Sequence, residues 1–415
     1  MMISTNKRKI YFIGDRINRH SIISVSAIIE NSKYGKNFVL EFYNFDDNFS
    51  TIEDNSFIFF SFFSGQLPQV YNILLKLKSR LSNIVAIAGG PHPSGAPFLT
   101  LKLGFDFVIK GEGEISIPIF LGALLGDKDF KDVPGLAYRN GDNFVLNDMP
   151  PPVDLDNTYS CSKSFGSCFP SEITRGCFFA CKFCQVSKLF GVIPRHKSVE
   201  KILETIKKGQ KYVRFVSPNA FSYGATKGKK INYTEIVRLL EGIKRIDKNI
   251  EIFFGSFPSE VRPEYINEDT LRILKEYTNN KVVAIGAQSG SNRMLKYIHR
   301  GHTKEDVYNA VELIHKAGLK AKVDFIFGLP SETSEDIKET LDFIEKIVKF
   351  NCEVRIHTFI PLVGTEFQNE KPGFIDPKVK KILMKLIGKG VASGPWLQKN
   401  QINKNLIKFY KEVNV

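Results

Sequence analysis

Short apolar runs alternate with amphipathic segments along the first third of the chain. This alternation is typical of a parallel α/β sheet, because strands covered on both faces are apolar throughout while helices are apolar on one side. Residues 1–150 are therefore expected to form a doubly wound parallel sheet, with a hairpin turn at Asn140-Gly141. The apolar runs predict strands at 10–14, 38–43, 57–63, 84–88 and 107–110, and helical patterns lie between them at 21–33, 67–81, 96–103 and 114–125.

A second series of strand and helix patterns follows a proline break at 150–152. We expect a linker over 151–171, then a partial parallel (β/α)6 barrel of the TIM type over 172–365, with functional residues at the strand carboxyl ends. Residues 366–415 predict a basic extension of two amphipathic helices. The barrel strands are expected to begin at Glu172, Tyr212, Ile250, Val282, Lys322 and Glu353, and its helices to span 198–208, 233–245, 267–277, 303–317 and 334–349.

The composition is that of a globular protein. The 415 residues are too many for one compact core, and 43% of them are hydrophobic and 25% charged. Mean hydropathy is −0.13, and no run approaches the roughly 20 apolar residues that a membrane span needs. The first residues lack the apolar core of a secretory signal. We therefore expect a cytoplasmic protein with no membrane span.

Positive charge is confined to the second part of the chain. Residues 1–150 hold 15 basic and 15 acidic side chains, so the whole net charge of +14 lies in 151–415. The last 43 residues hold nine lysines against Asp376 and Glu412. A polyanionic partner such as RNA, on whose bases Trp396 could stack, fits this asymmetry. Solvated helix faces, with Trp396 filling a gap against the barrel, are the alternative.

Glycine-rich turns stand where strands of the first sheet should end. Ligands of open α/β sheets bind in the crevice at the strand carboxyl ends, where glycine lets a ligand approach the backbone. Several such turns on one edge predict a ligand crevice, although His92 could instead stabilise its turn by a hydrogen bond. The candidate residues of this crevice are Ser64, Gly65, Gly89, Gly90, His92, Gly111, Glu112 and Glu114.

Three cysteines carry the sharpest chemical signal. Cys177, Cys181 and Cys184 form a C-x3-C-x2-C pattern on one loop directly after the first barrel strand. Three thiolates at this spacing can bind three irons of a cubane cluster and leave the fourth iron open to a substrate or cofactor. A zinc site would prefer a fourth ligand, and no histidine or cysteine stands at zinc-finger spacing. Three buried cysteines without a metal are the remaining alternative.

This loop, with the aromatic Phe183 directly before the third cysteine, resembles the signature of the radical S-adenosylmethionine (SAM) superfamily. The resemblance implies a 4Fe–4S cluster whose open iron binds the amino and carboxylate groups of SAM. One electron, from a donor such as ferredoxin or flavodoxin, then cleaves SAM to methionine and a 5′-deoxyadenosyl radical. This radical abstracts a hydrogen atom from the substrate.

Other segments resemble the SAM-binding strands of this superfamily. Residues 285–291 and Arg300 resemble its strand-four segment, with Gln288 where a glutamate is common. Residues 324–330 resemble the strand-five segment beside the adenine, and 361–365 resemble the strand-six turn. After strand two, Ser217-Pro218-Asn219 replaces the two glycines and glutamate that often hold the SAM amino group. The SAM contacts implied by these segments are Phe183, Ser217, Asn219, Gln288, Ser289, Arg300 and Phe327.

The N-terminal half resembles the flavodoxin-like cobalamin-binding domain that precedes many radical SAM domains. Gly-Gly-Pro-His at 89–92, Gly-Glu-Gly-Glu at 111–114 and the Asn-Gly hairpin carry this resemblance. Another common form of cobalamin site supplies a histidine to the lower face of the ligand. Here His20 stands at the wrong spacing, so cobalamin is expected to bind without it.

The positions of the other cysteines distinguish methyl transfer from methylthio transfer. Methylthiotransferases have a similar barrel but carry a second cluster on three N-terminal cysteines, and residues 1–150 contain none. Cys161 and Cys168 are too few for an auxiliary cluster and Cys352 lies on an expected strand, so we predict structural or free thiols. The resemblance therefore favours a cobalamin-dependent methyltransferase that acts at an unactivated carbon.

Two alternatives stay open from the sequence. One is a radical SAM rearrangement or ring-forming enzyme without methyl transfer, and the other is a structural iron–sulfur module that binds RNA through its basic half. No catalytic acid or base is evident. The substrate can be RNA, a protein or a small molecule.

Overall fold

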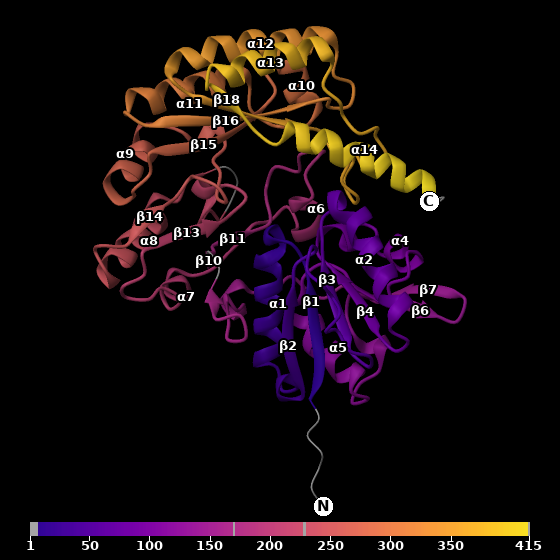
Figure 1. The fold of residues 1–415 in the computed structure, drawn as a ribbon. Helices are drawn as coiled ribbons and strands as arrows, with labels where there is room; N and C mark the ends of the chain where they lie inside the picture. Colours follow the sequence, from indigo (N-terminus) through magenta and orange to yellow (C-terminus); the bar gives the residue numbers. More distant parts are fainter. Residues whose placement is uncertain (1–6, 169–170, 227–229, 414–415) are drawn as a thin grey trace, which may run out of the picture. The chain divides into compact units, whose positions relative to one another are not determined.

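The structure is a computed structural model that describes residues 7–168, 171–226 and 230–413. The chain divides into two compact units (Figure 1). Unit 1 comprises Met1–Phe169, Leu362–Gly364 and Asn405–Val415, and unit 2 comprises Pro170–Pro361 and Thr365–Lys404. Across the described ranges, no helix is both long and apolar enough to cross a membrane.

Unit 1 is built on a seven-stranded sheet with the order β2-β1-β3-β4-β5-β6-β7. The first five strands are mutually parallel, and their 2-1-3-4-5 order is that of flavodoxin-like folds. The predicted doubly wound parallel sheet is therefore confirmed. The strands are β1 (Arg8–Ile13), β2 (Phe38–Tyr43), β3 (Phe57–Ser61), β4 (Val85–Gly89), β5 (Phe107–Ile109), β6 (Leu136–Asn140) and β7 (Asn143–Leu146).

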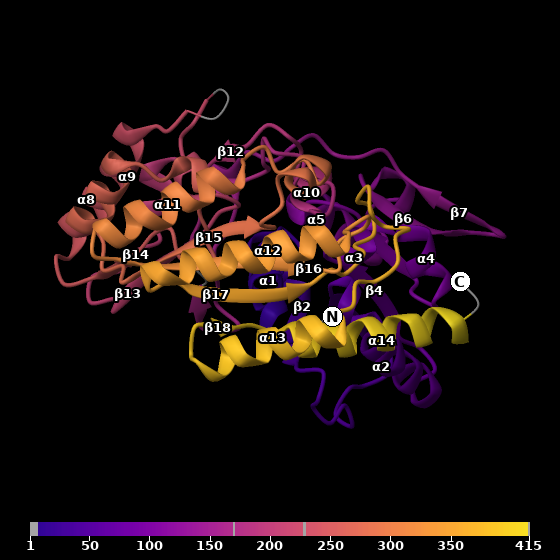
Figure 2. The same ribbon diagram turned by 90° about the horizontal axis from the view of Figure 1, so that it is seen from above.

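Helices cover both faces of this sheet. Ile10 and Phe12 of β1 share a buried cluster with residues of α1 and α5, whereas Tyr11 and Ile13 are buried on the opposite face. Figure 2 shows α2 on the other side of the sheet from α1 and α5. The helices are α1 (Arg19–Asn31), α2 (Leu67–Arg80), α3 (Pro91–Gly95), α4 (Pro97–Lys102) and α5 (Gly113–Leu124).

Two local features of unit 1 differ from the prediction. The helix expected at 96–103 is preceded by a second short helix, and the two are separated at Ala96 (φ −139°), because a residue before proline avoids the helical region and Pro97 follows. The hairpin loop is Gly141-Asp142, one residue later than expected. Asn140 still pairs with Asn143, and Gly141 takes the positive φ of +59°.

The described residues of unit 2 contain seven parallel strands in sequence order, six for the barrel and the short β18 after them. β10, β13 and β14 form one sheet, and β15, β16, β17 and the short β18 form another. A parallel bridge between Val261 and Ile285 joins the two. The predicted partial barrel is therefore confirmed. The strands are β10 (Ser171–Glu172), β13 (Tyr212–Val216), β14 (Glu251–Phe253), β15 (Val282–Gln288), β16 (Lys320–Phe327), β17 (Glu353–Thr358) and β18 (Ala392–Ser393).

Helices alternate with these strands and cover the outside of the barrel. The helix expected at 198–208 is shorter, since it ends at Leu203. There the Thr205 hydroxyl donates to the Ile202 carbonyl at 2.7 Å and competes with continued helical bonding. The helices are α6 (Val186–Phe190), α7 (Val199–Leu203), α8 (Tyr233–Ile246), α9 (Glu268–Tyr277), α10 (Asn292–Tyr297), α11 (Lys304–Lys316) and α12 (Ser334–Ile347).

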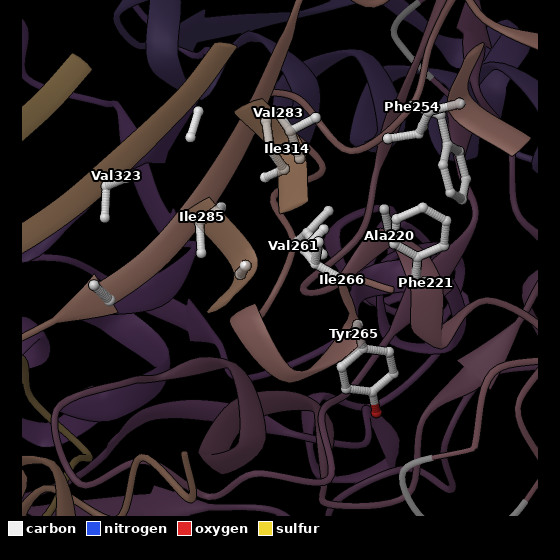
Figure 3. Packing of buried hydrophobic residues seen from close by; sticks show 14 of the residues in the cluster. Ala220, Phe221, Phe254, Val261, Tyr265, Ile266, Val283, Ile285, Ile314 and Val323 are labelled. Atoms are coloured by element: carbon white, nitrogen blue, oxygen red, sulfur yellow. The ribbon is translucent and has the colours of Figure 1, made fainter. Parts of the chain in front are cut away.

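The core of unit 2 lies between the strands and these helices. In Figure 3, Val283 of β15 lies beside Ile314 of α11. Phe221 meets Phe254 edge to face, with ring centroids 5.4 Å apart. Because alternate strand residues pack into this core, the residues between them point to the inner face of the barrel.

The basic C-terminal segment forms the two expected helices, α13 (Pro377–Gly388) and α14 (Trp396–Glu412). Val379, Leu383 and Leu386 form the buried stripe of α13. Trp396 is only 1% exposed, so it fills a gap in the fold and offers no surface on which a base could stack.

Candidate metal centre and cofactor sites

The three-cysteine loop begins at a glycine corner. β11 (Thr174–Arg175) pairs with the antiparallel β12 (Arg195–His196), and Gly176 follows β11 with a φ of +89°. A Cβ at Gly176 would lie 3.1 Å from three backbone carbonyl oxygens. The Cys177 amide donates to the Gly191 carbonyl at 3.1 Å, which closes the loop behind α6. The corner therefore requires glycine.

The cysteine side chains are free thiols in a partly desolvated environment. Cys181 is buried, while Cys177 and Cys184 are half-buried. Burial raises the pKa of the Cys177 thiol, and raises that of Cys184 to about 11. Iron binding would therefore displace protons from this loop.

The loop supplies three thiolate donors of the kind that hold a cubane cluster. Among the described residues, no three His, Cys, Asp or Glu side chains converge on one point as ligands of one metal ion. A cubane cluster does not need such convergence, because each thiolate binds a different iron. The free thiols of Cys177, Cys181 and Cys184 supply the donors that iron prefers.

Arg300 brings positive charge to this loop. Its Nη1 lies 3.6 Å from the Cys181 Sγ, and its Nη2 donates to the Gly286 carbonyl at 2.8 Å. A Cβ at Gly286 would lie 2.7 Å from both the Arg300 Nη2 and the Gln288 Nε2. Glycine at 286 therefore gives these two side chains room beside the β15 bulge, where Gln288 has a φ of +76°.

A second arginine, which the sequence analysis missed, lies behind Arg300. The Arg262 guanidinium is 3% exposed and lies 3.4 Å from the ring centroid of Phe179, inside the cysteine loop. Its Nε donates to Glu264 at 2.7 Å, and the same carboxylate faces His302. The available sequence signal was an arginine in the connection between the third and fourth strand patterns.

Several donors around this loop have no partner among the described residues. They are the Arg262 Nη1, the Asn219 Nδ2, the Arg300 Nε and the Tyr265 hydroxyl. A buried donor left without a partner costs about 1–3 kcal/mol, so donors of this kind mark the place of a ligand with acceptor atoms. A SAM carboxylate has such atoms.

Asn219 differs chemically from the glutamate that it replaces in the superfamily pattern. Its Oδ1 accepts from the Arg262 amide at 3.2 Å, which fixes the amide orientation and leaves the Nδ2 donor free. Asn219 therefore offers a donor where a glutamate offers an acceptor. Ser217 is occupied within the same turn, since its hydroxyl donates to the Asn219 carbonyl at 2.9 Å.

Three other expected SAM contacts, Phe183, Phe327 and Ser289, differ in their burial and in their neighbours. Phe183 is half-buried and packs against the core. The Phe327 side chain lies in the hydrophobic core, on the face opposite Asp324. Ser289 is fully buried, with its hydroxyl 3.3 Å from that of Thr340.

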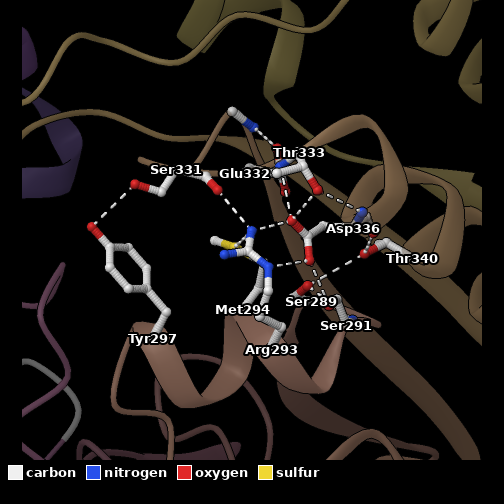
Figure 4. Close-up of polar contacts among 11 residues, drawn as sticks. Ser289, Ser291, Arg293, Met294, Tyr297, Ser331, Glu332, Thr333, Asp336 and Thr340 are labelled. Atoms are coloured by element: carbon white, nitrogen blue, oxygen red, sulfur yellow. Dashed lines mark hydrogen bonds and ion pairs between the residues drawn. The ribbon is translucent and has the colours of Figure 1, made fainter.

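The Ser289 region is a polar network on the outer side of β15 (Figure 4). Asp336 of α12 accepts from Ser291 at 2.7 Å, from Arg293 and from the Thr333 amide at 2.8 Å. These donors hold the pKa of Asp336 below its usual range. The network ties α10 to α12, which explains the burial of Ser289 without a ligand.

The candidate crevice of unit 1 lies at the carboxyl edge of the parallel strands. His92 is fully buried and stacks on Phe62, and its Nδ1 lies 3.1 Å from the Ser64 hydroxyl. Burial lowers the pKa of His92 to about 4. Its Nε2 has no partner among the described residues. His92 is thus a neutral imidazole that links the turns after β3 and β4. This is the turn-stabilising role that was expected as the alternative to ligand binding.

The remaining candidate residues of the crevice lie in the turns after β3, β4 and β5. The Gly111 amide donates to the Ser94 hydroxyl at 2.9 Å, and the Glu112 carboxylate accepts from the Val153 amide at 2.9 Å. Glu114 lies in the first turn of α5. Gly65 follows Ser64, and Gly90 has a φ of +92°.

These turns fit a large ligand such as cobalamin. A Cβ at Gly89 would have only the Ile109 carbonyl nearby, at 3.9 Å, so the backbone is open there. Ile17 and Phe63 follow β1 and β3, the two strands at which the strand order reverses, and are 63% and 39% exposed. Apolar surface at this switch point suits a planar ring system. His20 lies in the first turn of α1.

The other cysteines do not form a second metal site in the described residues. Cys161 is disulfide-bonded, so the prediction of a structural or free thiol was wrong for it. The side chain of Cys168 lies outside the described residues. Cys352 is buried, and its thiol donates to the Ile347 carbonyl at 3.3 Å.

Comparison with protein families gives two matches. The model of the radical SAM superfamily matches residues 171–344, and the model of the B12 binding domain matches residues 40–121. The first match contains the three cysteines and the second contains the turns after β3, β4 and β5. The two matches imply a 4Fe–4S cluster, SAM and cobalamin as the cofactors.

Several curated proteins are similar in sequence. A putative methylthiotransferase of Methanocaldococcus jannaschii is 34% identical over 59% of this chain and 53% of its own length. An uncharacterized methyltransferase of Pyrococcus horikoshii is 28% identical over 68% of this chain and 62% of its own length. A tRNA-2-methylthio-N(6)-dimethylallyladenosine synthase of Petrotoga mobilis is 31% identical over 75% and 68%. The chain thus spans little more than half the length of the first two relatives.

Two solved structures share the fold. The cobalamin-dependent SAM radical enzyme OxsB superposes with a TM-score of 0.64 and 18% identity, over 82% of this chain and 52% of that one. The radical SAM methyltransferase TsrM from Kitasatospora setae superposes with a TM-score of 0.66 and 14% identity, over 88% and 74%. The loop chemistry, both domain matches and this shared fold agree: the chain belongs to the radical SAM superfamily, in the group that carries a B12 binding domain.

Proposed function

We propose that this protein is a cobalamin-dependent radical SAM methyltransferase that acts at an unactivated carbon. One observation carries the proposal: a single chain combines a free three-cysteine loop, flanked by the buried Arg262 and the half-buried Arg300, with a flavodoxin-like sheet that matches a B12 binding domain. A radical generator alone would not need the second domain.

The residues of the barrel have separable tasks in this proposal. Cys177, Cys181 and Cys184 hold the cluster, and Arg300 stabilises the thiolate of Cys181. The free donors of Arg262 and Asn219 bind the carboxylate of SAM. When bound, the cluster supplies the electron that cleaves SAM, and cobalamin carries the methyl group. The core around Phe179 and Tyr265 excludes water from the reacting groups.

In unit 1, a side-chain contact holds two of the turns that border the crevice. Ser64 and His92 fix two adjacent turns, while Gly89 leaves the backbone open to a ligand. Ile17 and Phe63 supply exposed apolar surface beside these turns. We infer that these residues bind cobalamin without a histidine ligand. A one-electron donor such as ferredoxin or flavodoxin completes the set of partners.

Methylthio transfer is the second candidate function, because two relatives carry that activity in their names. The reaction in the resembling enzymes uses a second cluster held by three N-terminal cysteines. Residues 1–150 of this chain contain no cysteine, and Cys161 is disulfide-bonded. These observations support methyl transfer over methylthio transfer.

The test is product analysis under strictly anaerobic conditions with SAM labelled in its methyl group. A methyltransferase makes 5′-deoxyadenosine and S-adenosylhomocysteine from SAM and puts a labelled methyl group without sulfur on the acceptor. Substituting Ala for Cys181 should abolish 5′-deoxyadenosine, while the control Cys352→Ala should retain it. Sulfur in the product would support methylthio transfer, and absence of 5′-deoxyadenosine from the wild type would refute radical chemistry.

A further inference from the structure

Charged side chains occupy the inner face of the barrel, where strand alternation places them. Val323 and Phe325 of β16 pack into the core, so Asp324 between them faces inward. The same argument places Arg355 and His357 of β17 on that face. The strand register sets Asp324 beside Arg355.

Arg355 engages both carboxylates of this group. Its Nε and Nη2 donate to the two oxygens of Asp324 at 2.6 and 2.5 Å, and the Nη2 also donates to Glu260 at 2.5 Å. These carboxylates raise the pKa of the Arg355 guanidinium above its usual range. One cation therefore pairs with both acids that face it.

Helix α14 places another cation, Lys399, on the same face. The helix start is docked tightly, since a Cβ at Gly394 would lie 2.4 Å from the Ile356 carbonyl. Trp396 is buried beside it. The Asn403 amide donates to the Phe359 and Gly373 carbonyls at 2.9 and 2.8 Å. Lys399, between these anchors, is thereby held in a fixed position.

The ammonium of Lys399 has an imidazole as its partner in place of a carboxylate. Its Nζ lies 2.9 Å from the His357 Nδ1, and the His357 Nε2 lies 3.9 Å from Asp324. In the described part of the chain, Lys399 makes no ion pair within 4.0 Å. Burial lowers the pKa of Lys399 to about 8, against the opposing effects of Asp324 and Glu260.

Arg214 of β13 is a second inner-face cation, and no carboxylate pairs with it in the part of the chain that the structure describes. It lies between the core residues Val213 and Phe215, and its Nη1 donates to the Phe257 carbonyl at 3.2 Å. Its guanidinium lies 4.3 Å from the ring centroid of Phe253. The Arg355 guanidinium faces the 64% exposed ring of Phe257 from 5.8 Å. Both arginines therefore border Phe257.

A purely structural ion cluster would be expected to pair Lys399 with an acid. Desolvating an ammonium is costly unless an anion or several acceptors compensate it. Here two of the three Lys399 N–H groups have no acceptor in the described residues, and the nearby acids are engaged by Arg355. An acceptor supplied by a ligand would complete the arrangement.

We propose that Lys399 binds an oxyanion of the methyl acceptor, a carboxylate or a phosphate, on the inner face of the barrel. His357 and Asp324 orient the Lys399 ammonium, and Arg214 adds positive charge on the Phe257 side. The identification of the ligand as the methyl acceptor rests on the proposed function. The C-terminal helix is then part of the substrate site.

The test measures acylation of Lys399 in the reconstituted holoenzyme by an activated acetate ester near pH 8, followed by peptide mass spectrometry. Inorganic phosphate and acetate are the probes, with chloride at equal ionic strength as the reference. At ten times its dissociation constant, a bound oxyanion should slow Lys399 acylation about tenfold. The exposed Lys404 of the same helix should be unaffected.

Each outcome of this experiment decides the proposal. Protection by phosphate alone indicates a phosphorylated acceptor, and protection by acetate alone indicates a carboxylate. The proposal is overturned if neither ion protects Lys399, or if Lys404 is protected equally. His357→Asn should weaken the protection, whereas Lys404→Met should leave it unchanged. Because acylation needs no turnover, a failure of methyl transfer would leave this result intact.

Discussion

Arg300 contacts Cys181, which lies 119 residues earlier in the sequence. Arg262, in the connection between β14 and β15, contacts Phe179 of the same loop. The cysteine spacing and Arg300 were predictable because they follow short motifs. Arg262 was not, since its burial over Phe179 depends on how the third and fourth barrel strands are joined. The donor character of Asn219 likewise appears only once the Arg262 amide fixes its orientation.

Replacing Arg262 by glutamine tests its proposed contact with SAM. The change removes the buried Nη1 donor, for which the described residues supply no acceptor, so SAM should bind about tenfold more weakly or worse. Equilibrium binding of SAM to the reconstituted protein measures this. Arg272→Gln, at an exposed position of α9, is the matched control. Unchanged SAM affinity in the Arg262 variant would refute the contact.

Titration of Lys399 gives the oxyanion site a defined pH dependence. Its pKa of about 8 means that the ammonium is present below that pH and is lost above it. Protection of Lys399 by phosphate or acetate should therefore weaken as pH rises through about 8. His357, Asp324, Arg355 and Glu260 surround the ammonium and can shift this midpoint. Protection that stays constant well above pH 8 would exclude Lys399 as the donor.

At the scale of elements, apolar periodicity predicted most strands and helices because it reflects burial directly. It failed where one side chain decides the outcome, as at Pro97, which separates two helices, and at Thr205, which ends α7 early. The docking of α14 was also beyond prediction, since it depends on the close approach of Gly394 to Ile356.

The corner at Gly176 should be essential for the cysteine loop. An alanine at 176 would have to adopt a positive φ, and its Cβ would lie 3.1 Å from three carbonyl oxygens. The loop should therefore distort, and the iron content after reconstitution should fall sharply. Gly209→Ala is the control, because Gly209 shares the positive φ but has open space around it. That control should lose only about 1–2 kcal/mol of stability and keep its iron. Equal iron content in both variants would contradict this view of the corner.

The loop after β16 should make stability depend on pH. Burial raises the pKa of Glu332 to about 7, and among the described residues only one of its oxygens has a partner, the Gly328 amide at 2.6 Å. Between the ordinary pKa and 7, the unfolded chain has released this proton while the folded chain keeps it. The free energy of unfolding should therefore fall as pH rises through this window, by at most about 1.4 kcal/mol per pH unit.

Denaturant titrations from pH 5 to 7 test this dependence. Glu332→Gln keeps an acceptor for the Gly328 amide but cannot ionise, so its unfolding free energy should change less over the same range than that of the wild type. Identical pH profiles for the two proteins would show that Glu332 does not titrate as inferred.

At the scale of the whole molecule, two units of different architecture carry two different sets of cofactor residues. Unit 1 has a crevice at the carboxyl edge of its parallel strands, where Gly89 and His92 lie, and unit 2 has a three-cysteine loop. Both architectures were predictable, because each follows from a regular strand–helix alternation. The identity of the methyl acceptor was not, since it depends on inner-face side chains that distant elements bring together.

One chain of this protein should bind both a 4Fe–4S cluster and cobalamin. Iron and cobalt per chain, measured with a visible spectrum after anaerobic reconstitution with iron, sulfide and hydroxocobalamin, test it most directly. We expect about four irons and one cobalt per chain, and we expect Cys181→Ala to lose iron but keep cobalt. Four irons without cobalt would contradict the assignment of unit 1 and, with it, cobalamin-dependent methyl transfer.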